Sequence, residues 1–460
     1  MDPTDIQLMA HLLRRAGFGA RRDELEEYVA KGYEAVVDDL VNPERLPDVE
    51  EDLLNRYSDM TFEAKWFFRM ANTQRPLLEK MALFWHGVLA TGSSKSGHHN
   101  TAYDQILMLR EVALSDLRTI LSEMSKDPAM IFWLDNNENV RDEPNENYGR
   151  ELLELFSMGV GNYTEEDVKA STQSFTGWSF QSIIPGSTPY GKYPTHFLYR
   201  NDEHDVGAKS FLGQSGRLNG EDIIDVVVKQ PATARFIARH LYTFFVADEP
   251  AVASWNDLPP RDSEAIDILV KAYFESGANM RYILRVLFNS VFFKEARYRK
   301  VKSPAEVVTG VMKLTGDARF PATGIQRFVR ANMAMGQTLT NHVSVEGWHT
   351  GPDWIDGGTL NERVNFAVNE VEDSDKPGIR DMVERFASSA APVSPGDFVE
   401  RSLDLAGPVR VDDDTRTGLL SYAESGGELV FGTEAKREQS AARIVRMLQL
   451  IVSAREYQFG

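Results

Sequence analysis

The sequence predicts an all-α (mainly α) fold, a large multi-helix orthogonal assembly that carries one small β-hairpin. Apolar residues recur at helical spacing along most of the chain, beginning at Ile6 and Met9. Helix start signals recur as well, and Ser303-Pro304-Ala305-Glu306 is a capping box with proline at the first helical position. Residues rich in β-formers cluster in one stretch, 178–200, which limits the predicted sheet to a hairpin.

Glycine, proline and capping residues set the expected helix ends. Gly17 and Gly32 follow helical segments, Pro76 opens one, and Ser115 and Thr164 are candidate caps. The expected helices are Ile6–Leu13, Arg22–Ala30, Tyr33–Val41, Pro76–Ala90, Asp116–Met124, Pro128–Leu134, Pro144–Phe156, Val168–Phe175, Glu221–Lys229, Ala232–Val246, Ser263–Glu275, Met280–Asn289, Ala305–Leu314, Gln326–Thr338, Thr359–Val371, Asp397–Leu405, Asp413–Glu424 and Glu434–Tyr457.

The expected hairpin pairs Trp178–Ile184 with His196–Arg200 across the loop Pro185–Lys192. We expect residues 1–371 to form the helical body, with the hairpin inserted near 178–200. The more polar residues 372–460 are expected to form a C-terminal helical segment packed on that body.

Composition restricts the function. The net charge of −19 opposes binding to nucleic acids and anionic membranes. The absence of cysteine removes disulfides, thiolate catalysis and Cys-ligated metals. No signal peptide or membrane-spanning run is visible, so the chain is expected to be cytoplasmic, the alternative being export by a leader already removed. The sequence has no HExxH, Walker, GxGxxG or GxSxG motif, which argues against zincins, P-loop enzymes, Rossmann dehydrogenases and α/β-hydrolases.

The segment Pro144–Phe156 carries a charged stripe. On a helical wheel Glu146, Arg150 and Glu154 share one side, with Glu151 beside them. One interpretation is a solvent-exposed face with an ordinary ion pair four residues apart. The other is a cleft in which the carboxylates act as catalytic acid–base groups or metal ligands and Arg150 holds an anion.

Four further residues are candidates. His86 lies on a largely apolar helix, and His99 follows in a glycine- and serine-rich loop that would suit substrate binding. His204 sits among three carboxylates in a polar turn, and Trp348 lies in a glycine-rich aromatic loop that could close over a substrate. The alternatives are that His86 is a core histidine whose hydrogen bonds are satisfied within the fold, that the polar loops bind nothing, and that Trp348 packs its loop onto the helical body.

These motifs together resemble the DUF1800 family, whose function is unknown. The resemblance rests on Phe84-Trp85-His86, the run from Pro144 to Phe156, His204-Asp205 and Gly347-Trp348. It implies a mostly helical fold and a family in which alanine is usual at position 149. Family members often carry export signals, and their genes often neighbour those of DUF1501 proteins, which implies a possible DUF1501-type partner.

Two functions stay open at this point. The first is an enzyme, hydrolytic or oxidative, whose polar cleft uses Glu146, Arg150, Glu151 and Glu154. In it His86, His204, Glu151 and Glu154 would bind a divalent metal, with Zn, Fe and Mn suited to such ligands. The second is a non-catalytic accessory or scaffold protein that acts with a DUF1501-type partner.

Overall fold

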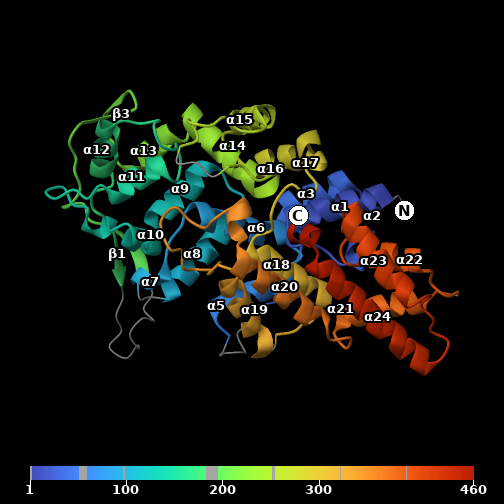
Figure 1. Cartoon of the computed structure of the whole chain (residues 1–460). Coiled ribbons are helices and arrows are strands. Elements are labelled where there is room, and N and C mark those ends of the chain that lie inside the picture. Colours follow the sequence, from blue (N-terminus) through green and yellow to red (C-terminus); the bar gives the residue numbers. More distant parts are fainter. Residues whose placement is uncertain are drawn as a thin grey trace. The chain divides into compact units, whose positions relative to one another are not determined.

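The computed structural model describes residues 3–50, 60–96, 99–182, 195–250, 254–321, 323–389 and 391–460, without the side chains of residues 3, 96, 99, 100, 182 and 323. With 62% of residues in helices and 6% in strands, the predicted all-α class is confirmed. Two compact units make up the chain (Figure 1). Unit 1 comprises Met1–Lys80, Phe293–Thr338 and His349–Gly460, and unit 2 comprises Met81–Phe292 and Leu339–Trp348.

The described residues of unit 1 form helices and no strand, with two isolated β-bridges, Val301 with Phe459 and Val393 with Leu429. Helices α18, α20, α21, α22 and α24 enclose a core that includes Val311, Ala367, Phe386, Phe398 and Leu448. The division expected at residue 371 lies inside this unit and stays a prediction. The helices are α1 (Pro3–Arg15), α2 (Arg22–Lys31), α3 (Tyr33–Val41), η1 (Pro43–Arg45), α5 (Phe62–Asn72), α18 (Pro304–Thr315), η3 (Thr323–Ile325), α19 (Gln326–Ala334), η4 (Gly351–Trp354), α20 (Gly357–Val371), α21 (Pro377–Ala387), α22 (Pro395–Leu405), α23 (Asp413–Ser425), α24 (Glu434–Ser453) and η5 (Arg455–Gln458).

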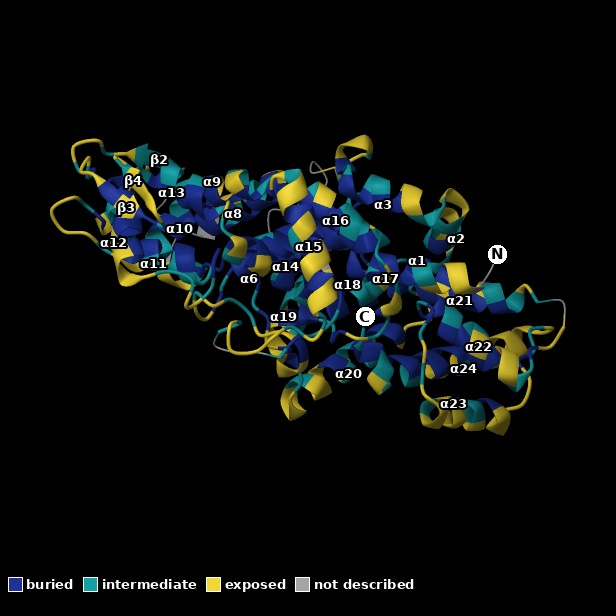
Figure 2. Cartoon of the chain, turned by 90° about the horizontal axis from the view of Figure 1, so that it is seen from above, coloured by how far each residue is buried: buried dark blue, intermediate teal, exposed yellow. Residues whose placement is uncertain are grey.

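Unit 2 contains the remaining helices and all four described strands. Amphipathic spacing is clear in α15, which buries Ile266, Leu269 and Tyr273 and exposes its opposite face (Figure 2). Two helices, α6 (Pro76–Val88) and α17 (Val291–Glu295), have residues in both units. The others are α7 (Ser93–Ser96), α8 (His99–Val112), α9 (Leu117–Lys126), α10 (Pro128–Trp133), η2 (Asn136–Glu138), α11 (Asn147–Glu154), α12 (Glu165–Ser174), α13 (Gly220–Val227), α14 (Pro231–Phe245), α15 (Ser263–Ser276) and α16 (Met280–Asn289).

The strands form two small antiparallel pairs rather than one. Strands β1 (Trp178–Ser182) and β2 (Thr195–Tyr199) confirm the expected hairpin, with Trp178 opposite Tyr199. Its expected loop, Pro185–Lys192, lies outside the described residues. The prediction of a single hairpin is wrong, because β3 (Lys209–Phe211) pairs with β4 (Gln214–Gly216). Leu212 and Gly213 both have positive φ in this tight turn, and strands of three residues leave almost no alternation to detect in the sequence.

Most capping predictions are confirmed. Ser303 and Thr164 each accept a hydrogen bond from the backbone three residues later, and both take part in a full capping box. The prediction of Ser115 as a cap is wrong, because Asp116 accepts from the Thr119 N–H at 3.0 Å. The expected Gln326–Thr338 helix ends earlier, at Ala334, before Gly336 with its positive φ. None of the described helices has the length and apolar character needed to span a bilayer.

Candidate functional site

Arg150 joins α11 to α12 through ion pairs. Its guanidinium donates to Glu146 at 3.1 Å and to the two carboxylate oxygens of Glu165 at 3.0 and 2.8 Å. Hydrogen bonding to Glu165, reinforced by Glu146, raises the pKa of Arg150. Both carboxylates are exposed, so solvent screens each pair and neither pair contributes much to stability. An anion could reach Arg150 only in competition with Glu146 and Glu165.

Glu151 and Glu154 lie one turn apart on α11, and their environments differ. Glu151 is half-buried, and burial together with the charges of Glu154 and Glu346 raises its pKa from 4.5 to about 7. Glu154 accepts a hydrogen bond from the Tyr163 hydroxyl at 2.5 Å. Burial and this hydrogen bond raise the pKa of Tyr163. A carboxyl group that exchanges its proton near neutral pH therefore stands beside a carboxylate held by a phenol.

Glu346 reaches this region on a loop whose position depends on glycine. Gly347 has φ +88°, and a Cβ there would lie 2.2 Å from the carbonyl oxygen of Gly87 on α6. A side chain at residue 347 would thus be both strained and blocked by backbone. The same approach puts Trp348 against α6, where a Cβ on Gly87 would lie 3.5 Å from the indole ring. The loop presents Glu346 and Trp348 on either side of this contact.

His86, His342 and Trp348 form a cluster of three rings. The centroid of the His342 ring lies 4.5 Å from that of His86 and 4.2 Å from that of Trp348. The backbone N–H of Thr340 donates to His86 Nε2 at 3.2 Å, so that this nitrogen is unprotonated. Burial, and then the neighbouring His342, lowers the pKa of His86. His86 is therefore a neutral core residue that the sequence presented as a candidate ligand.

His342 was not singled out by the sequence. Its Nδ1 lies 2.8 Å from the carbonyl oxygen of Thr91, which fixes Nδ1 as the donor, and burial lowers its pKa to about 4. Its Nε2 is buried and has no hydrogen-bond partner among the described residues. The partly exposed Trp348 covers this ring, so His342 supports the tryptophan that the sequence proposed as a substrate contact.

The family model for DUF1800, a protein family of unknown function, matches residues 11–459. The chain belongs to the DUF1800 family. Searches of curated proteins and of solved structures each found no match. The expected family resemblance is thereby confirmed over nearly the whole chain, including the residues from Pro144 to Phe156 and the segment around Trp348.

Part of this DUF1800 sequence signature packs the fold. The Tyr148 hydroxyl lies 2.5 Å from the Ser125 hydroxyl, and Tyr148 is buried. Gly149 faces α12 so closely that a Cβ would lie 2.7 Å from Thr172 Oγ1 and 2.8 Å from the Thr172 backbone nitrogen. Gly149 therefore belongs to the contact between α11 and α12.

His204 belongs to a different environment in this DUF1800 protein. Its Nδ1–H donates to the carbonyl oxygen of Thr176 at 2.8 Å, and its ring lies 5.4 Å from that of Tyr199. Asp205 makes a second contact with Thr176, because its N–H donates to the Thr176 hydroxyl at 2.8 Å. Described contacts do not join His204 to His86, Glu151 or Glu154. The side chain of His99 lies outside the described residues.

Across the described part of the chain, no three His, Asp or Glu side chains form a group that could hold a metal ion. The predicted ligands His86, His204, Glu151 and Glu154 thus gain no support from the geometry of these residues. What the structure brings together is Glu151, Glu154 and Tyr163, with Glu346 close enough for its charge to affect Glu151.

Proposed function

We propose that this DUF1800 protein is an enzyme in which Glu151 and Glu154 form the acid–base pair of a hydrolytic reaction. The observation that carries the proposal is the contrast between the two carboxyl groups on α11. Glu151 is half-buried beside two other carboxylates, whereas Glu154 is held by the Tyr163 hydroxyl. Two carboxyl groups in different environments can fill the roles of acid and base.

Hydrolysis fits because water is the only co-reactant that it needs. In the proposed step Glu154 takes a proton from water while the water oxygen attacks the substrate. Protonated Glu151 donates its proton to the leaving group, and the two carboxyl groups then exchange protons with solvent. A pKa near 7 allows Glu151 to act as an acid at neutral pH. Tyr163 orients Glu154 through its hydrogen bond.

The charges around the pair restrict the substrate. Glu151, Glu154 and Glu346 together disfavour phosphate, sulfate and carboxylate groups near the reacting bond. A neutral or cationic substrate, such as an ester, amide or glycoside, meets no such repulsion. Trp348, supported by His342, would contact its apolar or sugar surface.

The test is an assay of the full chain against neutral chromogenic esters, amides and glycosides. Glu151→Gln and Glu154→Gln should each lower kcat/KM by about 10²–10⁴-fold, the usual contribution of general acid–base catalysis. Glu166→Gln, which alters an exposed carboxylate on α12, is the matched control and should leave the rate unchanged. Hydrolysis that survives both α11 substitutions would overturn the proposal.

A second candidate is a non-catalytic accessory protein that acts with a DUF1501-type partner. It is favoured by the ion pairs of Arg150, which join α11 to α12 and give part of the charged stripe a structural use. The same assay separates the two functions, because absence of hydrolysis in all three substrate classes would favour the accessory protein.

A further inference from the structure

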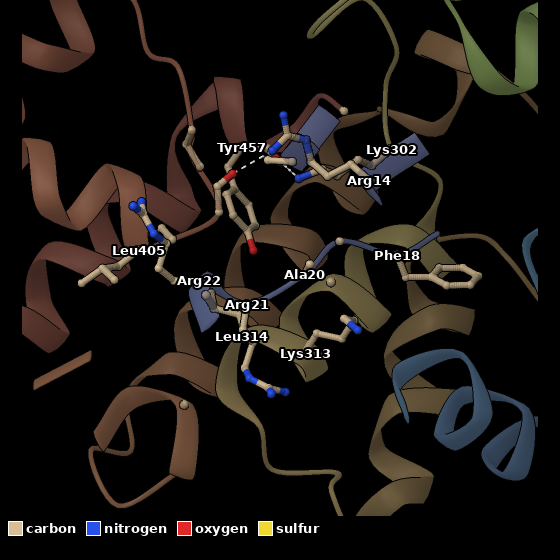
Figure 3. Close-up of a pocket in the computed structure, with 18 of the residues that line it drawn as sticks. Arg14, Phe18, Ala20, Arg21, Arg22, Lys302, Lys313, Leu314, Leu405 and Tyr457 are labelled. Carbon is tan, nitrogen blue, oxygen red and sulfur yellow. Dashed lines mark hydrogen bonds between the residues drawn. The ribbon is translucent and has the colours of Figure 1, made fainter. Parts of the chain in front are cut away.

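Unit 1 contains a cavity of about 160 Å³. Its walls come from the end of α1, the turn into α2, helix α18 and the residues around Leu405 and Tyr457 (Figure 3). A cavity of roughly 150 Å³ in a protein interior holds one benzene ring. The space is therefore sufficient for a small organic molecule.

The cavity is unusually cationic for a chain with a net charge of −19. Seven basic side chains line it against four carboxylates. The basic side chains are those of Arg14, Arg15, Arg21, Arg22, Lys302, Lys313 and Arg385. Concentration of one sign of charge in a hollow with low-dielectric walls raises the local concentration of ions of the opposite sign.

The carboxylates of the lining are already engaged. Glu306 is buried and pairs with Lys80, with Arg15 at 3.7 Å and with Lys300 at 3.6 Å. Burial opposes ionisation of Glu306, but Lys300, Lys80 and Arg15 outweigh it and hold its pKa well below its usual range. The carboxylate of Glu306 thus already pairs with three cations and cannot neutralise the other basic side chains that line the cavity.

The remaining three carboxylates have partners too. Asp23 and Asp381 are each paired with an arginine, at 3.2 and 3.4 Å. Glu456 accepts a hydrogen bond from the backbone N–H of Asp412 at 3.0 Å. None of the three forms an ion pair with Arg14 or Lys302 in the part of the chain that the structure describes.

Arg14 is the lining residue with the most unused hydrogen-bonding capacity. Its Nη1 donates to the carbonyl oxygen of Gly407 at 2.7 Å, and the guanidinium lies 5.1 Å from the centroid of the Tyr298 ring. Its Nε and Nη2 are buried and have no partner among the described residues. Buried N–H groups of a charged guanidinium lower stability unless an acceptor reaches them.

Lys302 lies beside Arg14 in Figure 3, with Tyr457 next to both. Its Nζ donates to the carbonyl oxygen of Tyr457 at 2.7 Å and lies 4.2 Å from the centroid of that ring. Burial, and then the charge of Arg14, lowers the pKa of Lys302 to about 7. An anion between these two cations would offset their repulsion and accept from the unused Arg14 N–H groups.

We propose that this cavity binds a small organic oxyanion, a carboxylate or phosphate carried on an apolar body about the size of one aromatic ring. Arg14 and Lys302 would hold the oxyanion, since among the described residues they are the two lining cations without a carboxylate partner. Phe18, Leu314 and Leu405, which also line the cavity, would contact the apolar body (Figure 3). The opposite charge preference separates this site from the proposed acid–base pair of unit 2.

The experiment is calorimetric titration of the full chain with phenyl phosphate, benzoate and inorganic phosphate. We expect an aryl anion to bind with a dissociation constant below about 1 mM, and at least tenfold more tightly than inorganic phosphate. Arg14→Gln and Lys302→Gln should each weaken binding at least tenfold. Arg14→Lys keeps the charge but loses the guanidinium fork, so it should retain only part of the affinity.

Arg437→Gln is the control, because Arg437 is exposed on α24 and does not line the cavity. Its affinity should equal that of the wild type. Thermal unfolding of each variant without ligand identifies a variant that has failed to fold, and the second variant then decides. The proposal is overturned if the wild type binds neither aryl anion, or if folded variants at Arg14 and Lys302 bind both as tightly as Arg437→Gln does.

Discussion

Replacing Glu151 with glutamine should stabilise the protein at alkaline pH. In the folded chain the pKa of Glu151 is raised from 4.5 to about 7, by burial and by the charges of Glu154 and Glu346. Between these pH values the unfolded chain loses the Glu151 proton while the folded chain retains it. Wild-type stability therefore falls as pH rises through this range, and Glu151→Gln removes that loss.

The size of the expected stability difference follows from the same pKa of Glu151. A tenfold change in proton affinity corresponds to about 1.4 kcal/mol, so the displacement from 4.5 to about 7 gives an upper bound of about 3.5 kcal/mol. Glu151 is only half-buried, and solvent screening reduces this to about 1–2 kcal/mol. The variant should therefore exceed the wild type by about that amount at pH 8 and match it at pH 4, where both side chains are neutral.

The assay is urea unfolding of both proteins at pH 4, 6 and 8, followed by circular dichroism. Glu166→Gln is the matched control and should show no comparable dependence on pH, since Glu166 is exposed. A wild-type protein as stable as Glu151→Gln at pH 8, or a difference that does not change with pH, would refute the reasoning.

Three further predictions concern unit 2, which contains Glu151. Glu346→Gln removes a charge that raises the pKa of Glu151, so the carboxyl ¹³C titration of Glu151 should move to lower pH; an unchanged midpoint would contradict the proximity of the loop. Gly149→Ala should destabilise α11 by about 1–3 kcal/mol because the added Cβ meets the backbone of α12. Gly418→Ala is the control: a Cβ at Gly418 meets open space, so this substitution should stabilise α23 by about 0.5–1 kcal/mol. Amide hydrogen exchange in α11 and in α23 measures the change in stability of each helix. If the two alanine substitutions changed exchange in the same way, the close contact at Gly149 would be ruled out. Because burial lowers the pKa of His342 to about 4, the wild type should lose stability as pH falls from 6.5 to 4, and His342→Asn should reduce that loss in thermal unfolding; an unaltered slope would show that His342 does not cause it.

Local signals in the sequence were sufficient for most helices. The capping box at Ser303 and the proline that follows it specify where α18 begins without help from the rest of the fold. Ser115 shows the limit of such reasoning, because the neighbouring Asp116 is also a residue type that caps helices and only the backbone conformation decides between the two. The second hairpin was missed since three-residue strands carry no detectable alternation.

The candidate site was only partly predictable for a different reason. Glu151 and Glu154 could be found because both lie on one helix at fixed spacing. Glu346 and His342 come from a loop distant in sequence, as the sequence separation of 254 between Thr340 and its acceptor His86 illustrates. No single segment of the sequence reveals that residues so far apart lie together in the fold. The same applies to Arg14 and Lys302, which come from two separate segments of unit 1's sequence and line the same cavity.

The opposite charges of the two proposed sites have a consequence for any ligand search. Added salt screens the repulsion that Glu154 and Glu346 exert on Glu151, and it should therefore move the pKa of Glu151 toward its ordinary value. At the cavity of unit 1, salt weakens the attraction between an oxyanion and the cations Arg14 and Lys302. A neutral substrate of unit 2 should thus keep its affinity in salt while an anionic ligand of unit 1 loses affinity. Repeating each titration at two salt concentrations therefore separates a neutral compound bound in unit 2 from an anion bound in unit 1 before any variant is made.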